Sequence, residues 1–404
     1  GAWSDFEYDF SGSTFFYPID LTNSYYAKPI NFSGSTYQGG ADFSGSIYQE
    51  EAYFSGSIYQ GRANFSDSTY KDVADFSGST YQGGADFSGS TYKSWADFSG
   101  STYKVGAYFS GSTYQEEAYF SGSTYKSWAY FTDSTYQALA YFSSSIYQGW
   151  AYFGGSIYQG GAYFSRSIYQ GGTDFRGSTY QSRADFSGSI YIYQGGTNFT
   201  GSTYQSRADF TDSIYQGWAD FTDSIYQGEA NFSRSTYQGE ANFSRSTYRG
   251  RATFNRSTYE NETNFSGSIF YQETYFGEDG YSNSSSCFTN HAPQFYDKKK
   301  RKNTLFGSPN NDFTVDIDKG YPIDLDSKGI PLNCKFLTSE QKEYLEGKLQ
   351  EIEKINNKLF EVKDLAKKTE LSEKLRSLNE ELYEWREEVT TVKVEDVVAE
   401  DTKS

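Results

Sequence analysis

The alternation of small, polar and aromatic residues in this chain follows an undecapeptide repeat. From Ile30 to Glu273 it reads as 22 consecutive units of the form Ala-[Asp/Asn/Tyr]-Phe-Ser-x-Ser-[Thr/Ile]-Tyr-Gln-x-x, as in 74–84. In that unit, two segments each contain a small or polar residue, then a polar residue, then a large aromatic one: Ala74-Asp75-Phe76 and Ser79-Thr80-Tyr81. This is the period-two pattern of a strand with one buried face. Gly residues lie between the two segments, where the chain must turn. The pattern predicts very short β-strands joined by tight corners.

Strands this short cannot be stable alone, so neighbouring units must stack and bury their apolar side chains together. We expect the Phe and Tyr rings of successive units to form ladders inside the stack, with the variable positions in corners or facing outward. We also expect two units per coil, because a loop of one undecapeptide leaves little room for a Phe and a Tyr facing each other inside. Representative ladder residues are Phe43, Tyr48, Phe76, Tyr81, Phe98, Tyr103, Phe232 and Tyr237.

One unit, 184–196, departs from the length of the others. It carries an extra Ile-Tyr pair and reads Ser-Ile-Tyr-Ile-Tyr-Gln where other units read Ser-Ile-Tyr-Gln. An inserted pair preserves the in/out alternation of a strand, whereas a single inserted residue would move every following side chain to the other face. The insertion therefore suits a strand, and replication slippage accounts for it equally well.

The half-unit 74–78 resembles the pentapeptide-repeat pattern, in which a small residue and a central Leu or Phe point inward. Residues 79–83 are a looser second copy, and one extra residue in each undecapeptide interrupts the period of five. The resemblance covers the array 30–273, which is more than half of the chain. It implies a right-handed, four-sided β-helix. Two alternatives stay open: a disordered Tyr/Ser/Gly-rich assembly protein, and another form of β stacking such as a silk-like meander.

The flanks of the array differ from it. The string Tyr-Pro-Ile-Asp-Leu at 17–21 recurs at 321–325, and we interpret both copies as parts of caps, because solenoid ends need covering. We predict a cap region over 1–29, the solenoid array over 30–273, and a linker or C-terminal cap over 274–337. That last segment carries the basic run 298–302, which is interpreted as a solvated linker, a nuclear-import signal or a processing site.

A helical segment follows over 338–390, and an acidic tail over 391–404. Thr338 and Gln341 form a capping-box pattern, and Thr369 is a candidate cap for a second helix. The apolar spacing predicts a helical hairpin or two coiled-coil segments that associate with another copy or a partner. The predicted helix interface consists of Leu371, Leu375, Leu378, Leu382, Trp385 and Val389.

Composition limits the chemistry that this chain can perform. Its 404 residues include 40 Tyr and 34 Phe but one His and two Cys. With a single His, a zinc site or a His-dependent catalytic triad is not expected, and the many Ser residues have no base to activate them. We expect no enzyme activity and no cofactor. Cys287 and Cys334, both outside the array, are a candidate disulfide pair.

The net charge of −17 argues against direct binding to nucleic acid, which requires clustered Lys and Arg. No apolar run is long enough to span a membrane. The chain starts at Gly1 without a Met, so we expect a processed end or a fragment boundary. The compartment stays open, with an extracellular location slightly favoured and a nuclear one compatible with the basic run.

The favoured function is a non-enzymatic, elongated structural or scaffold protein that self-associates through solenoid ends or C-terminal helices, or presents a regular surface to a protein partner. The resemblance implies an alternative, an acidic DNA mimic directed at a topoisomerase. A further alternative is an ice-binding solenoid with Thr ladders, although Ile at 47, 58, 146, 157 and 168 interrupts them.

Overall fold

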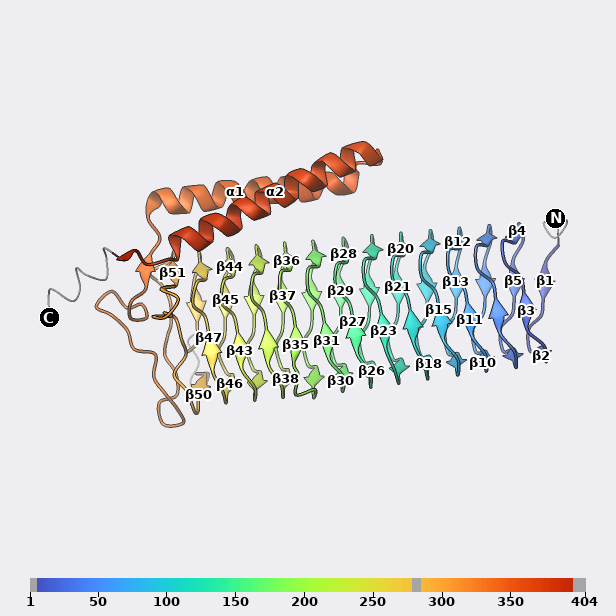
Figure 1. Ribbon diagram of the computed structural model, residues 1–404, viewed down its shortest axis with the longest axis horizontal. Coiled ribbons are helices and arrows are strands. Elements are labelled where there is room, and N and C mark those ends of the chain that lie inside the picture. Colours follow the sequence, from blue (N-terminus) through green and yellow to red (C-terminus); the bar gives the residue numbers. More distant parts are fainter. Residues whose placement is uncertain (1–5, 278–284, 395–404) are drawn as a thin grey trace. The chain divides into compact units, whose positions relative to one another are not determined.

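The computed structural model describes residues 6–277 and 285–394 of the chain. They belong to two compact units, residues 1–202 with 212–217 and residues 203–211 with 218–404. Each unit is built from successive parallel rungs of two-residue strands, and the second also contains two helices (Figure 1). The predicted fold class, a β-solenoid followed by a helical hairpin, is confirmed. A disordered array is not what the chain forms.

One coil consists of four strands, such as β13 (Ala74–Asp75), β14 (Thr80–Tyr81), β15 (Ala85–Asp86) and β16 (Thr91–Tyr92). The chain then returns to β17 (Ala96–Asp97), which pairs in parallel with β13 and places Ala96 opposite Ala74. The coil is right-handed. Since Ala74 and Ala96 open repeats that are two places apart in the array, one coil contains two repeats, as predicted.

Every fourth strand joins the same sheet, and we call the sheets of β13, β14, β15 and β16 sheets A, B, C and D. In the first unit, the four sheets run from β1 (Tyr8–Asp9) to β33 (Ala184–Asp185), β2 (Thr14–Phe15) to β38 (Ile214–Tyr215), β3 (Ile19–Asp20) to β35 (Thr197–Asn198) and β4 (Tyr25–Tyr26) to β32 (Thr179–Tyr180). In the second unit they run from β37 (Ala208–Asp209) to β49 (Thr274–Tyr275), β42 (Thr236–Tyr237) to β50 (Cys287–Phe288), β39 (Ala219–Asp220) to β47 (Thr263–Asn264) and β36 (Thr203–Tyr204) to β52 (Lys335–Phe336).

The interior of each coil is filled by four kinds of side chain from the repeat. Ala74, Phe76, Ser79 and Tyr81 are all buried. The Phe76 ring stacks on the rings of Phe54 and Phe98, one coil away on each side, with centroids 5.1 Å apart in both pairs. Stacked or edge-to-face aromatic pairs contribute about 0.5–1.5 kcal/mol each beyond burial of their area. The near-invariant positions of the repeat are therefore the ones that fill the core.

The inward Ser of each half-coil satisfies polar groups that the aromatic core cannot. The Ser79 hydroxyl donates to the Phe54 carbonyl at 3.3 Å and accepts a hydrogen bond from the Ser57 amide at 3.1 Å. The same pair of bonds recurs one coil later at Ser101. Buried backbone groups without partners are costly, so this serine ladder explains why Ser rather than Ala follows each tight corner.

The corner between the half-units has its own sequence requirement. The Asp75 carboxylate accepts hydrogen bonds from the Ser77 amide at 2.9 Å and the Ser77 hydroxyl at 2.6 Å. Gly78 follows with φ +64°, a conformation in which a Cβ is unfavourable. Asp or Asn at the outward strand position thus stabilises the turn that Gly permits.

The insertion in 184–196 does not extend a strand. Tyr191, the last residue of β34 (Ile190–Tyr191), continues the inner ladder by stacking on Tyr169 and Tyr215. Ile192 and Tyr193 instead leave the strand in the following corner and are exposed. The interpretation that the pair preserves strand alternation is wrong, because stacking fixes each strand at two residues and only the corner can absorb extra chain.

The C-terminal part of the second unit is less regular. It contributes β50, β51 (Leu305–Phe306) and β52 to the sheets, with loops between them. The two copies of Tyr-Pro-Ile-Asp-Leu differ, since 17–21 contains β3 (Ile19–Asp20) whereas 321–325 is a loop held by the Tyr321 amide on the Phe288 carbonyl. The cap and linker boundaries stay predictions, and part of the predicted acidic tail lies outside the described residues.

Two helices follow, α1 (Ser339–Glu361) and α2 (Leu365–Val389). The predicted capping box is present, with the Gln341 amide donating to the Thr338 hydroxyl at 3.1 Å and the Thr338 amide donating to the Gln341 side chain at 2.9 Å. Thr369 does not cap the second helix. Asp364 does so, accepting from the Lys367 amide at 2.9 Å, because the chain is extended at Val362 and Asp364 and resumes the helix immediately afterwards.

We predict that Phe76→Ala lowers the free energy of unfolding by about 3–5 kcal/mol, because it removes a buried ring and leaves a cavity. Chemical denaturation measures the loss, and hydrogen exchange should place it in the adjoining coils, since each coil contacts only its neighbours. Tyr81→Phe is the matched control. The Tyr81 hydroxyl has no hydrogen-bond partner among the described residues, so its removal should cost nothing. Equal losses in the two variants would contradict the stacking account.

Candidate interaction surfaces

The predicted ladder residues lie in the core and cannot contact a partner. Each stacks on its counterpart one coil away, with centroids 5.0 Å apart for Phe43 and Phe65, 4.6 Å for Tyr48 and Tyr70, and 4.8 Å for Tyr81 and Tyr103. Burial raises the pKa of the Tyr48 and Tyr81 hydroxyls well above the ordinary value, so both stay protonated at physiological pH. The remaining ladder residues, in the same arrangement, are Phe76, Phe98, Tyr103, Phe232 and Tyr237.

The outward positions form rows along the sheets, because equivalent residues lie opposite one another in register. Sheets A and C present the residue between Ala and Phe, which is Asp, Asn or Tyr. Sheets B and D present the residue before the inner Tyr, which is Thr or Ile. On sheet D of the first unit, four consecutive coils present Thr69, Thr91, Thr113 and Thr135 in register.

Two runs of outward Tyr interrupt the Asp and Asn rows of the first unit. On sheet C, the Tyr130 ring stacks on Tyr108 and Tyr152 with centroids 5.2 and 4.9 Å apart. On sheet A, the Tyr141 ring stacks on Tyr119 and Tyr163 at 5.2 and 5.3 Å. These rings are exposed or half-buried, and they are the largest apolar groups in the outward rows of these two sheets.

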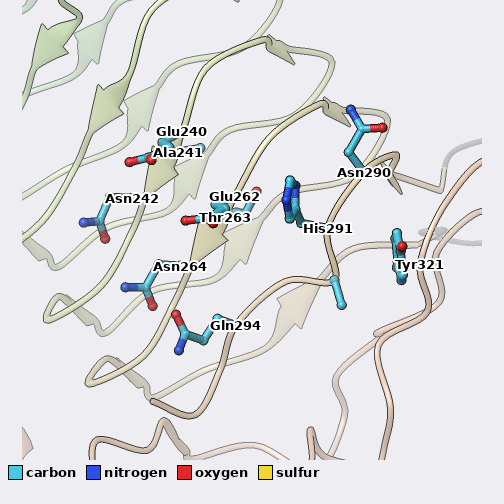
Figure 2. Close-up of a pocket in the computed structure, with 11 residues that line it drawn as sticks. Glu240, Ala241, Asn242, Glu262, Thr263, Asn264, Asn290, His291, Gln294 and Tyr321 are labelled. Atoms are coloured by element: carbon cyan, nitrogen blue, oxygen red, sulfur yellow. The ribbon is translucent and has the colours of Figure 1, made fainter. Parts of the chain in front are cut away.

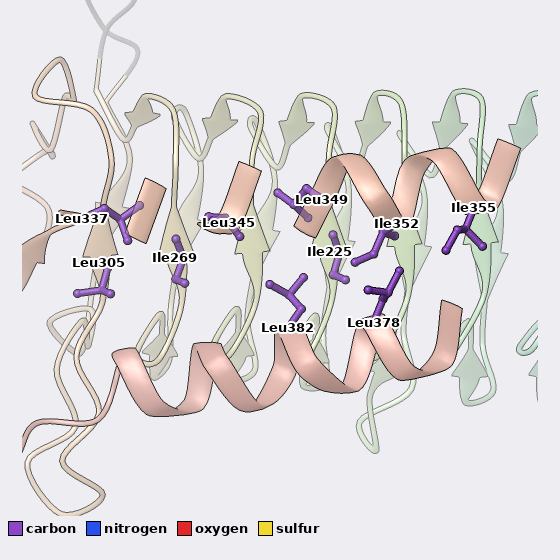
Figure 3. Packing of buried hydrophobic residues seen from close by; sticks show 10 residues of the cluster. All are labelled: Ile225, Ile269, Leu305, Leu337, Leu345, Leu349, Ile352, Ile355, Leu378 and Leu382. Carbon is purple, nitrogen blue, oxygen red and sulfur yellow. The ribbon is translucent and has the colours of Figure 1, made fainter. Parts of the chain in front are cut away.

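The helical hairpin covers sheet D of the second unit. Figure 3 shows residues of α1 and α2 packing over the outward row of that sheet. There Ile225, Ile269 and Leu305 take the row position and are buried. The cluster comprises Ile225, Ile269, Leu305, Leu337, Leu345, Leu349, Ile352, Ile355, Leu378 and Leu382. The hydrophobic effect contributes about 25 cal/mol for each Å² buried, so this contact holds the hairpin on the sheet.

The predicted helix interface is occupied within the chain. Leu378 and Leu382 are buried in the cluster, and Leu371, Leu375, Trp385 and Val389 are half-buried against it. The Trp385 ring stacks on Tyr344 of α1 with centroids 4.8 Å apart. Self-association through this stripe stays a prediction, and it would require the hairpin to open.

A charged cluster fixes α2 to a corner of the same sheet. Arg386 is 2% exposed, and its guanidinium lies 3.4 Å from the Asp223 carboxylate. Arg245 donates to both oxygens of that carboxylate at 3.1 and 3.0 Å. Burial lowers the pKa of Arg386 below its ordinary range. Sequence reasoning did not identify this cluster, and Ile in the outward row was no signal of a covered face, since Ile47 and Ile58 take the same position and are exposed.

The basic run is part of this docking region. Asp297 and Lys302 form an antiparallel bridge, and the Lys302 ammonium contacts the Glu387 carboxylate and donates to the Thr391 hydroxyl at 2.8 Å. Residues 298–300 are exposed at the turn. The interpretation as a solvated linker therefore does not extend to Lys302, which joins the loop to α2.

A polar hollow of about 500 Å³ lies over sheet C of the second unit. Figure 2 shows Glu240, Asn242 and Asn264 on its strand side, with His291 and Tyr321 on two loops, before and after β51. The Asn242 and Asn264 oxygens accept hydrogen bonds from the amides of Ser244 and Ser266. The hollow can offer hydrogen bonds to a polar ligand. Within 6–277 and 285–394, no group of three or more His, Cys, Asp or Glu side chains could hold a metal ion.

The two cysteines are free thiols, so the candidate disulfide is wrong. Cys287 begins β50 in sheet B and its Sγ lies 3.6 Å from the Thr258 hydroxyl. Cys334 precedes β52 in sheet D, and its Sγ contacts the Phe295 carbonyl at 3.8 Å. Burial raises the pKa of Cys334 to about 12. Cys287 belongs to sheet B, whereas Cys334 lies next to the strand of sheet D on the opposite side of the coil.

Comparison with known proteins agrees with this geometry. Residues 71–113 match the family model described as pentapeptide repeats (9 copies), and this stretch lies within the right-handed β-solenoid. That family is generally a non-enzymatic structural fold, and its members commonly mediate protein interactions. Searches of curated proteins and of solved structures find no match to this chain. Among the described helices, neither is apolar enough over sufficient length to cross a bilayer.

We predict that Asp223→Asn releases the helical hairpin, because it leaves the buried Arg386 charge without a carboxylate. The expected cost is about 2–3 kcal/mol, below that of a fully buried pair because Asp223 is partly exposed. Hydrogen exchange of α2 and proteolysis near 362–364 measure the release. Glu380→Gln is the control, since it removes a carboxylate that pairs with Arg376 where both side chains are mostly exposed and should change neither readout. Full protection of α2 in Asp223→Asn would refute the role of the cluster.

Proposed function

We propose that this chain is a non-enzymatic scaffold, a rigid solenoid that assembles with copies of itself or with protein partners through its outward rows. The observation that carries the proposal is that separate positions of the repeat fill the core and form the surface. The inward Ala, Phe, Ser and Tyr positions are buried in the core. Each outward position presents one side chain per coil, at a spacing of about 4.8 Å. A surface of this kind can bind a partner with a matching repeat without any change to the fold.

Several observations disfavour the acidic DNA mimic. The Tyr runs interrupt the Asp rows of sheets A and C, so the carboxylates do not follow one another as phosphates do along a duplex. Many of the Asp carboxylates also accept hydrogen bonds from their own turns, as Asp75 does from Ser77. Some of these are also paired with Arg, as Asp86 is with Arg62 at 3.4 Å and Asp185 with Arg183 at 3.3 Å.

The scaffold proposal predicts concentration-dependent assembly of the purified full chain. Sedimentation velocity from low to high micromolar concentration should show growing species, and electron microscopy should show particles with a regular lateral repeat. Assembly should weaken when outward rows are changed and the core is left intact. A chain that stays monomeric over the whole range, at low and physiological salt, would count against self-assembly as its function.

Ice binding is a second candidate, favoured by the uninterrupted threonine row 69, 91, 113 and 135 on sheet D. It predicts thermal hysteresis for the native chain. The double variant Thr91→Lys/Thr113→Lys should abolish it, because two hydrated charges disrupt ordered water on that face. Thr102→Lys on sheet B is the matched control. Freezing without hysteresis in the native protein would eliminate this candidate.

A further inference from the structure

The two Tyr runs of the first unit lie on opposite sides of the solenoid. Sheets A and C are separated by sheet B in one direction around the coil and by sheet D in the other. One undecapeptide covers half a coil. Advancing along the chain by one repeat therefore moves from sheet A to sheet C and rises along the solenoid axis by half a coil. The repeat therefore builds two similar aromatic surfaces that face in opposite directions.

We define the face C patch as Tyr108, Trp128, Tyr130, Trp150 and Tyr152, and the face A patch as Trp95, Tyr119, Leu139, Tyr141 and Tyr163. Three residues of the face C patch are substantially exposed, Trp128 at 53% and Trp150 and Tyr108 at 40% each. Single exposed apolar residues need no explanation, but contiguous runs over three coils mark interaction sites. Tyr and Trp are also enriched in protein interfaces, because they bury a large area at a low cost in entropy.

The rings of both patches lie against glycine backbone, which holds them in place. A Cβ added at Gly106 would meet the Tyr108 hydroxyl at 2.7 Å, and one added at Gly161 would meet the Tyr163 hydroxyl at 2.8 Å. At Gly172 it would meet the Trp150 ring at 2.7 Å. With the stacking between coils, these contacts keep the rings ordered before binding, which reduces the entropy lost in a complex.

Most charged residues in the corners bordering the two patches have opposite signs, with Lys93, in the corner of Trp95 on face A, as the exception. Lys104 and Lys126 occupy the corners that lead into the face C strands, and both are exposed. Glu116 and Glu117 occupy the corner that leads into face A, next to Tyr119. The Glu117 carboxylate adds to partial burial in raising the pKa of the Tyr119 hydroxyl, in keeping with its position beside that ring. The net charge of −17 opposes the association of two copies in general, so a contact between them needs apolar or charge-complementary surfaces such as these.

We propose that the face C patch of one copy binds the face A patch of another, with the Lys104 and Lys126 border against the Glu116 and Glu117 border. This inference rests on the proposed scaffold function and names its contact. The ring spacings match, since both rows repeat at 4.9–5.3 Å. Each copy presents one patch of each kind on opposite sides, so the contact is heterologous and propagates into an open lateral array.

Reversal of the borders tests the pairing directly. Lys104→Glu/Lys126→Glu and, separately, Glu116→Lys/Glu117→Lys each place like charges across the contact, and each should raise the concentration needed for assembly by about tenfold or more. A mixture of the two variants restores opposite charges and should assemble as the native chain does. Sedimentation velocity at low salt measures all four samples, and added salt should reduce the differences.

An aromatic variant tests the patch itself without relying on charge reversal. Tyr130→Asp/Tyr152→Asp should abolish assembly and leave the fold intact, because Asp86 and Asp174 already occupy this position in the same row. Tyr53→Asp, in the face A row but outside the patch, is the control and should assemble normally. If the native chain assembles and the patch variants assemble equally well, or if the mixture fails to recover, this pairing is wrong while the scaffold function stands. A native chain that never assembles overturns both.

Discussion

The structure depends on the face-to-face stacking of equivalent aromatic rings one coil apart. Phe stacks on Phe and Tyr on Tyr with centroids 5.1 and 4.8 Å apart in the coils around Phe76 and Tyr81, which is close to the spacing that backbone hydrogen bonds impose on parallel strands. Neither interaction could set the structure alone, since two-residue strands have few hydrogen bonds and free aromatic pairs have no fixed register. Together they require that equivalent residues of successive coils be alike. The repeat in the sequence is the consequence of that requirement.

This constraint also decides where the sequence can vary. The corners and outward positions make no contribution to the inner ring stacks, so they can accept Glu, Lys, Trp or an inserted Ile-Tyr pair. Variation there produces surfaces with their own chemistry on an unchanged core. In the first unit it creates threonine rows and aromatic runs, and in the second it creates an apolar row at Ile225 and Ile269 that the hairpin covers. One core thus supports several surfaces.

The hairpin illustrates how a local pattern can identify a buried face without identifying what covers it. The spacing of Leu378 and Leu382 indicated a helix with one buried face, and that face is buried. Periodicity does not reveal what lies opposite, and here it is sheet D of the same chain rather than a second molecule. Arg386 shows the limit most clearly, because a lone Arg in a charged helix gives no sign that it will be enclosed beside Asp223 and Arg245.

The sequence by itself determined the β-solenoid, the inward Phe and Tyr residues, the glycine corners and the existence of two helices. All of these follow from local periodicity, which repeats often enough to leave few alternatives. Only the tertiary structure decided that the cysteines stay apart, that Lys302 anchors a helix, that the inserted pair leaves the strand, and that Tyr runs occupy opposite faces. Each of these depends on which residues distant in sequence meet around the coil, and that is set by the closure of each coil after two repeats and by the docking of the hairpin.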